Sequence, residues 1–463
     1  MIKRFQKPKI INNEESIGKF ESRKESEIEI LNDDCLNYIF GFLQIKDKVK
    51  IERVCKRWQE VSKNSWKNIK TLNENVNVWG FNPCIRSSEE LTLIFDKVLQ
   101  RCGHTLTHVD FSFLSVQNNA LHHIAIMCPN LQSLNVGKLN LTIPLVEIMT
   151  ANCQNIKEIT FTTCSEECND YQLSKFFSVN KKLRYLKITN NENLTGKFLE
   201  SLPRDSMQTI IMNDCTKITS HNIAQVIANF ENLRTLSFAE NQYSAFGDST
   251  AIIVSLSKNI EELRLGALLK LNAKATSSLT NLQILDVTNS EDISNTFLTV
   301  LAKNCKKILN LNLSGCTQIT DAGINEISRL PKLEELYIKN LNNVTDQPLK
   351  YLPKLKRLSC ASSCKIRDDG LCTLISSCDS IELLDCKHCK CITNNLVDCA
   401  IKITKLRKNG IILKLDVRGT SVDSESVSDK SPLLDLLLPS TNSSGSNWYF
   451  HDYGFHTYND DDD

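Results

Sequence analysis

The chain of 463 residues lacks an excess of charge of either sign, because its 55 Lys and Arg residues balance its 54 Asp and Glu residues. The net charge of +1 gives no bulk attraction for nucleic acid or an anionic membrane, so we predict neither as a partner. The sequence also has no N-terminal apolar stretch of the secretory type and no apolar run of the ~18 residues that a membrane helix needs. We therefore expect a soluble protein that is not secreted.

Catalytic and cofactor motifs are missing as well. The sequence contains no Gly-x-Ser-x-Gly, no phosphate-binding Gly-Lys-Ser/Thr loop, no Gly-x-Gly-x-x-Gly and no His-Glu-x-x-His. Carboxylate pairs such as Glu261-Glu262 fall within expected strands, where adjacent side chains face opposite ways and cannot act on one bond. We predict no catalytic residues, no cofactor and no enzymatic activity.

Cysteine, in contrast, is abundant, with 19 residues. In a short secreted chain this number would indicate disulfides or a metal centre. In a long chain without a secretory signal, we expect the thiols to stay reduced, which predicts a cytoplasmic or nuclear location, or both.

Residues 308–332 show the pattern on which the rest of the chain is organised. Apolar residues at Ile308, Leu311 and Leu313 have the alternation of a short, half-buried strand, and Ile324 and Ile327 indicate a short helix. A unit this small cannot bury its own apolar face, so it needs neighbours of the same kind.

The strand pattern, apolar-x-x-apolar-x-apolar, recurs with spacings of 22 to 27 residues, except for a last spacing of 31. This period is that of leucine-rich repeats. It predicts an α/β solenoid, a leucine-rich-repeat horseshoe of about 13 repeats, over residues 73–420. The strand starts are Leu106, Leu131, Ile156, Leu183, Met207, Leu233, Ile260, Leu282, Ile308, Leu333, Leu355, Ile381 and Ile412.

The two ends of the array are less regular. Val76 and Val78-Trp79 suggest an irregular first strand within an N-terminal cap, and residues 88–102 read as a helix. Residues 421–463 lose the period and form an acidic and aromatic tail, whose aromatic residues from Trp448 to Tyr458 suggest that it docks on the solenoid. Residues 1–28 are polar and mixed in charge, which predicts a disordered arm.

The segment from Cys386 to Cys391 holds three thiols and the imidazole of His388, as a metal site would. The repeat register favours a different interpretation. Cys386 takes the strand position of Leu313, and Cys389 takes that of Cys316, so both should point into the solenoid interior and pack as small apolar groups. We therefore predict no metal site.

Residues 29–72 differ in kind from the repeats. Asn32 or Asp33 can cap a helix with Leu36, Ile39, Phe40 and Leu43 on one face. A second helix, capped by Asp47, would carry the apolar stripe Ile51, Val54, Cys55, Trp58 and Val61, and residues 65–70 would form a third. Such a module has a very small core, so we expect it to lean on a partner.

These residues carry a resemblance. The segment from Leu31 to Leu43, followed by Val54-Cys-Lys-Arg-Trp58 and the later Trp66, resembles an F-box, with Asn32 where that family usually has Pro. The Cys that recurs after the strand at Cys164, Cys215, Cys316 and Cys389, with Ile-Thr-Asp-x-Gly at 319–323, is similar to the cysteine-containing leucine-rich repeats that accompany F-boxes. The chain thus resembles the F-box and leucine-rich-repeat family.

The resemblance implies a substrate-recognition subunit of a Skp–cullin–F-box ubiquitin ligase. The module, a small all-α F-box, would bind a Skp-type adaptor and through it a cullin–RING ligase. The repeats would hold a protein target for ubiquitination and proteasomal degradation. The alternative is a leucine-rich-repeat scaffold or regulator with no role in ubiquitination. The implied adaptor contacts are Leu31, Asn32, Leu36, Ile39, Phe40, Leu43, Val54 and Trp58.

Residues between the apolar strand positions should line the concave face of the horseshoe. In the C-terminal third they are more basic, and exposed Tyr and Arg are common in binding hot spots. We predict this C-terminal strip as the target-binding face, suited to an acidic or phosphorylated segment. Its residues are Tyr337, Lys339, Arg357, Asp385, Lys387, Lys414 and Arg418.

Overall fold

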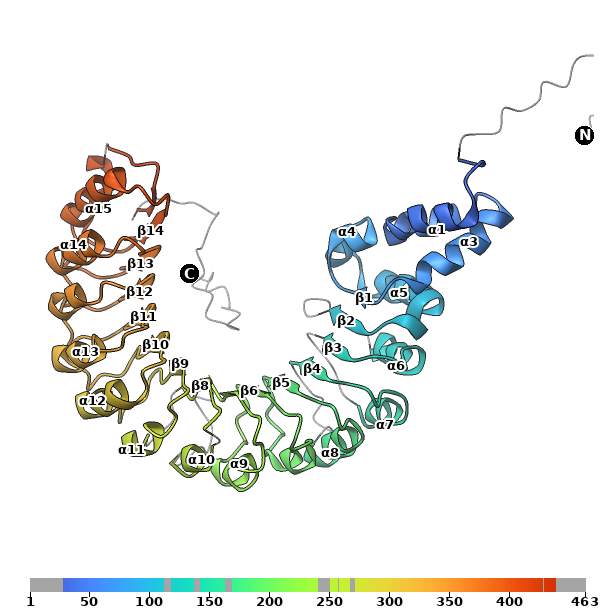
Figure 1. The fold of residues 1–463 in the computed structure, drawn as a ribbon, viewed down its shortest axis with the longest axis horizontal. Coiled ribbons are helices and arrows are strands. Elements are labelled where there is room, and N and C mark those ends of the chain that lie inside the picture. The colour runs from blue at the N-terminus through green and yellow to red at the C-terminus, as the bar shows by residue number, and fades with distance from the viewer. Residues whose placement is uncertain are drawn as a thin grey trace, which may run out of the picture.

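The computed structural model describes residues 28–111, 118–136, 142–162, 169–239, 250–256, 258–266, 271–427 and 429–438. It is an arc with a helical module at its N-terminal end, strands on the concave side and helices on the convex side (Figure 1). Residues 1–27 of the predicted N-terminal arm and the aromatic part of the predicted tail lie outside the described residues.

The strands form one parallel sheet in which each strand pairs with the next along the chain. The described strands are β1 (Thr71–Leu72), β2 (His108–Phe111), β3 (Ser133–Val136), β4 (Glu158–Phe161), β5 (Tyr185–Thr189), β6 (Thr209–Asn213), β7 (Thr235–Ser237), β8 (Glu262–Arg264), β9 (Ile284–Asp286), β10 (Asn310–Asn312), β11 (Glu335–Tyr337), β12 (Arg357–Ser359), β13 (Leu383–Asp385), β14 (Leu413–Asp416) and β15 (Leu434–Leu437).

Helices of one to four turns connect the strands across the convex side. The described α-helices of the solenoid are α4 (Val76–Trp79), α5 (Ser88–Cys102), α6 (Asn118–Met127), α7 (Ile143–Asn152), α8 (Asp170–Val179), α9 (Ser220–Ile227), α10 (Thr250–Ser255), α11 (Ala273–Thr276), α12 (Asn295–Asn304), α13 (Asp321–Ile327), α14 (Asp368–Ser377) and α15 (Asn394–Leu406). Short 3₁₀ turns are η1 (Pro83–Ile85), η2 (Gly103–Thr105), η3 (Lys197–Ser201), η4 (Gln347–Tyr351) and η5 (Ser424–Ser426).

The thirteen predicted strand starts precede β2 to β14, which confirms the leucine-rich-repeat register. The array also extends at both ends. β1 has only two residues, and β15 pairs with β14 beyond the predicted boundary at residue 420. The predicted irregular first strand is wrong: Val76–Trp79 is the helix α4, capped by the side chain of Asn75.

The core follows the repeat pattern. Ile308, Leu311, Leu313 and Cys316 are fully buried, as are their equivalents in the neighbouring repeats, and they form one continuous apolar core along the arc. Cys386 and Cys389 belong to the same core, as the register predicted. Burial raises the pKa of the Cys386 thiol to about 11, so the group stays protonated at neutral pH.

A turn with positive φ follows the strands at a fixed place in the register. The residue seven positions after the strand start has a left-handed conformation in many repeats, and Asn289, Gly315, Asn340 and His388 are examples. Asn and Gly adopt this conformation most readily. His388 is therefore a turn residue and is exposed, whereas Cys386 and Cys389 on either side are fully buried.

The N-terminal module consists of α1 (Asp33–Gly41), α2 (Ile45–Ile51) and α3 (Lys56–Lys67). Asn32 caps α1 through its side chain, as predicted. The prediction of one continuous second helix from Asp47 to Val61 is wrong. The helix is interrupted between α2 and α3, and Cys55 caps the start of α3. The predicted third helix at 65–70 is also wrong, since α3 runs continuously to Lys67.

The module has only a small core of its own, in which Leu36, Phe40 and Val61 are buried. It packs against the solenoid instead: Ile45 and Trp66 are part of the main core, together with Leu72 and Trp79. A module of this size cannot supply enough apolar burial alone, so the end of the solenoid completes its fold.

A polar cluster, which we call the junction, covers this contact. The Trp66 indole N–H donates to Glu52 Oε1 at 2.7 Å, and the Arg101 guanidinium of α5 donates to both Glu52 oxygens at 2.8 to 3.2 Å. Burial disfavours the charged carboxylate, but the hydrogen bonds from Arg101 and Trp66 outweigh this effect and hold the pKa of Glu52 below its usual value.

Substitution Glu52→Ala is expected to lower the free energy of unfolding by about 1–3 kcal/mol, because it leaves the buried Trp66 N–H and Arg101 without their acceptor. The carboxyl has a lower pKa in the folded than in the unfolded chain, so its stabilisation is present at neutral pH and is lost as pH falls through the lowered pKa. The difference between the two proteins should therefore shrink in acid, as measured by urea unfolding across pH. The control Glu60→Ala removes an exposed pair with Lys63 and should change stability by less than about 0.5 kcal/mol.

The two cysteines Cys386 and Cys391 provide a matched test of the core interpretation. Cys386→Ser should lower the free energy of unfolding, measured by urea denaturation, by about 1–3 kcal/mol, because it places a hydroxyl in a fully buried apolar position. Cys391 is exposed, so Cys391→Ser should cost less than about 0.5 kcal/mol. Equal destabilisation by the two variants, accompanied by loss of a bound metal, would contradict this interpretation.

Candidate functional site

The structure separates the eight predicted adaptor contacts into three groups. Leu36 and Phe40 are buried in the core of the module, so they support its fold and offer no surface. Three are half-buried and three are exposed. The half-buried ones are Leu31, Leu43 and Trp58, and the exposed ones are Asn32, Ile39 and Val54.

Several exposed apolar side chains of the module were missed by the sequence analysis. Ile30, Tyr38 and Phe42 are 72%, 70% and 74% exposed, and the rings of Tyr38 and Phe42 meet edge to face at 4.9 Å. With Ile39 at 40% and Val54 at 59%, they make up what we call the apolar surface of the module. Large apolar side chains this exposed are candidates for contact with a partner protein.

Two polar residues shape this surface. The Oδ1 atom of Asn32 accepts a hydrogen bond from the Cys35 N–H at 2.8 Å, so this residue, where the F-box family usually has Pro, acts as a helix cap. Arg57 of α3 donates to the Asp33 carboxylate at 2.8 Å and to the carbonyl of Glu29 at 3.1 Å. Arg57 therefore holds the segment that leads into α1 against the start of α3.

The predicted C-terminal strip lies on the concave side, but much of it is occupied by internal contacts. Tyr337 is 3% exposed and donates to Glu335 at 3.0 Å, and Asp385 is fully buried and accepts from Ser359 at 2.7 Å. These two side chains offer almost no surface to a partner. The Ser359–Asp385 bond joins the neighbouring strands β12 and β13, whereas Tyr337 and Glu335 lie on the same strand, β11.

The basic residues of the strip are largely matched by acids. Arg357 lies 3.6 Å from Glu335, and Lys387 and Arg418 lie 3.9 Å and 2.9 Å from Asp416. Lys339 is half-buried and Lys414 is exposed. The prediction that this strip binds a target stays a prediction, and its net positive charge is smaller than the sequence suggested.

Other kinds of site have little support in the described residues. No group of three or more His, Cys, Asp or Glu side chains there could hold a metal ion. None of the described helices has the length and apolar character needed to cross a membrane.

The F-box domain profile matches residues 28–70, which include α1, α2 and α3. One similar protein, from Caenorhabditis elegans, is named "Putative RNA-binding protein EEED8.10" and is 21% identical over 73% of this chain and 50% of its own length. Another, the Arabidopsis thaliana F-box/LRR-repeat protein 17, is 25% identical over 66% of this chain and 47% of its own length. The chain thus spans about half the length of each of these curated relatives.

Two solved structures with a similar arrangement have low sequence identity to this chain. The yeast complex of Rad7 and Elc1 contains a chain that is 16% identical, covers 71% of this chain and 96% of its own length, and has a TM-score of 0.47. A Listeria monocytogenes internalin is 15% identical, covers 87% of this chain and 96% of its own length, and has a TM-score of 0.45. The chain thus combines an F-box domain at residues 28–70 with a solenoid of the leucine-rich-repeat type, and it is similar in sequence to an F-box/LRR-repeat protein.

Proposed function

We propose that the chain is a non-catalytic substrate-recognition subunit of a Skp–cullin–F-box ubiquitin ligase. The observation that carries this proposal is the apolar surface of the F-box domain, with Phe42 and Val54 largely exposed. A Skp-type adaptor would cover these side chains and link the chain to a cullin–RING ligase. The adaptor contacts would therefore centre on exposed residues. Leu36 and Phe40 would contribute only indirectly, because they form the core that supports these residues.

The role of the solenoid is to hold the target. It binds a protein segment and keeps target lysines near the ubiquitin-loaded enzyme, which supplies proximity instead of chemistry. The F-box domain shares Ile45 and Trp66 with the core of the solenoid, so adaptor and target are held in a fixed relative orientation. Degradation of the target by the proteasome follows from ubiquitination.

The proposed location is the cytoplasm, the nucleus or both. Many cysteines are fully buried with their thiols in the repeat core, where burial raises the pKa, as it raises that of Cys102 to about 12. A reducing compartment suits a chain whose described cysteines are all free.

A second candidate is a leucine-rich-repeat scaffold whose N-terminal helices only close the array. The observation that favours it is the packing of α3 on α5 through Trp66 and the junction, which is what an end cap requires. An end cap, however, gives no reason for the exposure of Phe42 and Val54.

The test is co-purification of a Skp-type adaptor with the full chain and with the double variant Phe42→Ala/Val54→Asp. We expect adaptor affinity to fall at least about tenfold, because the variant removes two exposed apolar contacts without touching the core. The matched control is Val254→Asp on α10, a side chain that is 68% exposed on the convex side of the solenoid.

Each outcome decides between the two candidates. Equal adaptor recovery by the wild-type chain and the double variant would place the docking contacts elsewhere and contradict the proposed surface. Failure of the wild-type chain to recover any adaptor would favour the scaffold. Circular dichroism of each variant shows whether the fold is retained.

A further inference from the structure

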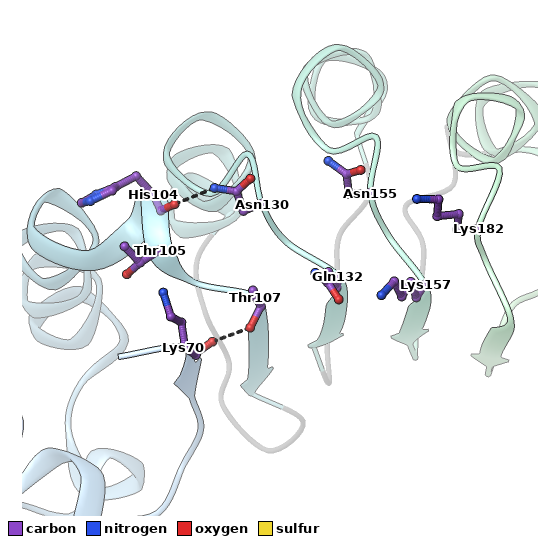
Figure 2. A pocket seen from close by; sticks show the side chains of 9 residues that line it. All are labelled: Lys70, His104, Thr105, Thr107, Asn130, Gln132, Asn155, Lys157 and Lys182. Atoms are coloured by element: carbon purple, nitrogen blue, oxygen red, sulfur yellow. Dashed lines mark hydrogen bonds between the residues drawn. The ribbon is translucent and has the colours of Figure 1, made fainter. Parts of the chain in front are cut away.

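A polar groove lies on the rim of the solenoid beside the F-box domain, at the ends of the strands where they begin (Figure 2). Its volume is about 480 Å³. Nine residues line it, and we call it the basic groove because three are lysines and none is a carboxylate. The lining residues are Lys70, His104, Thr105, Thr107, Asn130, Gln132, Asn155, Lys157 and Lys182.

The repeat register builds this groove. Lys70, Thr107, Gln132 and Lys157 each come directly before a strand, in four successive units from β1 to β4. Their backbones are already joined in a ladder, in which the Lys157 N–H donates to the Gln132 carbonyl at 2.7 Å. Their side chains are therefore presented side by side along the rim.

The positive charge of the groove is not compensated within the described part of the chain. None of its three lysines forms an ion pair with a described residue. The nearby carboxylate of Glu158 pairs with Arg184 instead, at 2.6 Å. In the C-terminal strip, by contrast, Arg357 and Lys387 already have acidic partners. The basic groove is thus the better place for an anion.

The groove continues onto the concave side as a second hollow of about 570 Å³. The residues that follow Lys70, Thr107 and Lys157 in sequence, namely Thr71, His108 and Glu158, line it. This second hollow contains Asp110 and Glu158 but no lysine or arginine among its lining residues. It also contains the Asn135 Oδ1 atom, which is buried and accepts no hydrogen bond from the described residues.

These features favour a peptide over RNA as the ligand. RNA carries a phosphate at every nucleotide, so Asp110 and Glu158 would repel its continuation into the second hollow. The basic groove has no Phe, Tyr or Trp on which bases could stack. A peptide with one strongly charged anionic group fits both hollows, because its remaining backbone N–H groups can donate to the carboxylates that line the second hollow.

We propose that the basic groove binds a phosphorylated segment of a protein partner. The phosphate, with a charge near −2, is held by Lys157 and Lys182, which belong to neighbouring repeats (Figure 2), and the segment runs on across the strand ends into the second hollow. The amides of Asn130, Gln132 and Asn155 bond to its backbone. The proposal deepens the proposed function, since the segment belongs to the target.

The test uses a pool of short peptides with a fixed phosphoserine flanked by randomised residues. The comparison probes are the same pool without phosphate and a single-stranded oligouridine RNA. Retention on the immobilised full chain is measured in the absence of any adaptor. We expect the phosphorylated pool to be retained at least about tenfold better than the unphosphorylated pool, with retention falling as salt rises.

The decisive variant is Lys157→Glu/Lys182→Glu, which should abolish this preference. Lys332→Glu is the matched control, because Lys332 takes the register position of Lys182, directly before the strand start of a distant repeat, and is also exposed. Lys157→Gln/Lys182→Gln, which removes charge without reversing it, should weaken retention at least about tenfold and covers any misfolding of the first variant.

Several results would overturn the proposal. One is a wild-type chain that shows no preference for phosphate, and another is a preference that survives both double variants. Loss of the preference on charge reversal at Lys339, Arg357 and Lys387, with the basic groove intact, would move the site to the C-terminal strip. Retention of oligouridine but not of the phosphorylated pool would assign the groove to RNA. If the chain still binds the adaptor in these cases, only the phosphopeptide proposal fails and the proposed ligase role is unaffected.

Discussion

No single repeat of this chain can bury its own apolar face, and the rest of the architecture follows from that constraint. Leu311 is fully buried only because Leu285 and Leu336 lie beside it on the neighbouring strands β9 and β11. Each repeat is covered by its neighbours, so uncovered apolar faces remain at the two ends of the array. At the C-terminal end, β15 pairs with β14. At the N-terminal end, the F-box domain covers the last apolar layer with Trp66 and Ile45.

The F-box domain is also too small to bury all of its apolar side chains by itself. Its separate core contains only three buried residues, Leu36, Phe40 and Val61. One face of its helices therefore rests on the solenoid, and the other keeps large apolar side chains such as Phe42 in solvent. A domain too small to bury all its apolar residues is well suited to bind a partner, because the exposed ones gain from being covered.

Much of this could be predicted from the sequence, and the reason is periodicity. The spacing of the apolar strand positions located β2 to β14 and explained why Cys386 and Cys389 are core residues. It could not locate β1, because two residues carry no alternation. It also gave no sign of the break between α2 and α3, where the stripe from Ile51 to Trp58 continues although the helix does not.

The sites were harder to predict than the fold. The C-terminal strip looked basic when residues were taken one strand at a time, but pairing across strands matches Arg357 with Glu335. The basic groove was missed because Lys70, Lys157 and Lys182 lie far apart in the sequence and outside the strands. The register that aligned the strands also aligns the turns before them. Applied to those turns, it would have placed the three lysines along the same rim of the solenoid.

The shared core at the junction has a consequence for how the chain loses its structure. Trp66, Glu52 and Arg101 tie α3 to the first repeats, so loss of structure in those repeats would remove the support of the F-box domain. In the proposed role, a damaged chain would then lose its adaptor and its target together. Folding of the F-box domain is thereby coupled to folding of the solenoid, because Ile45 and Trp66 are buried only when the first repeats are in place.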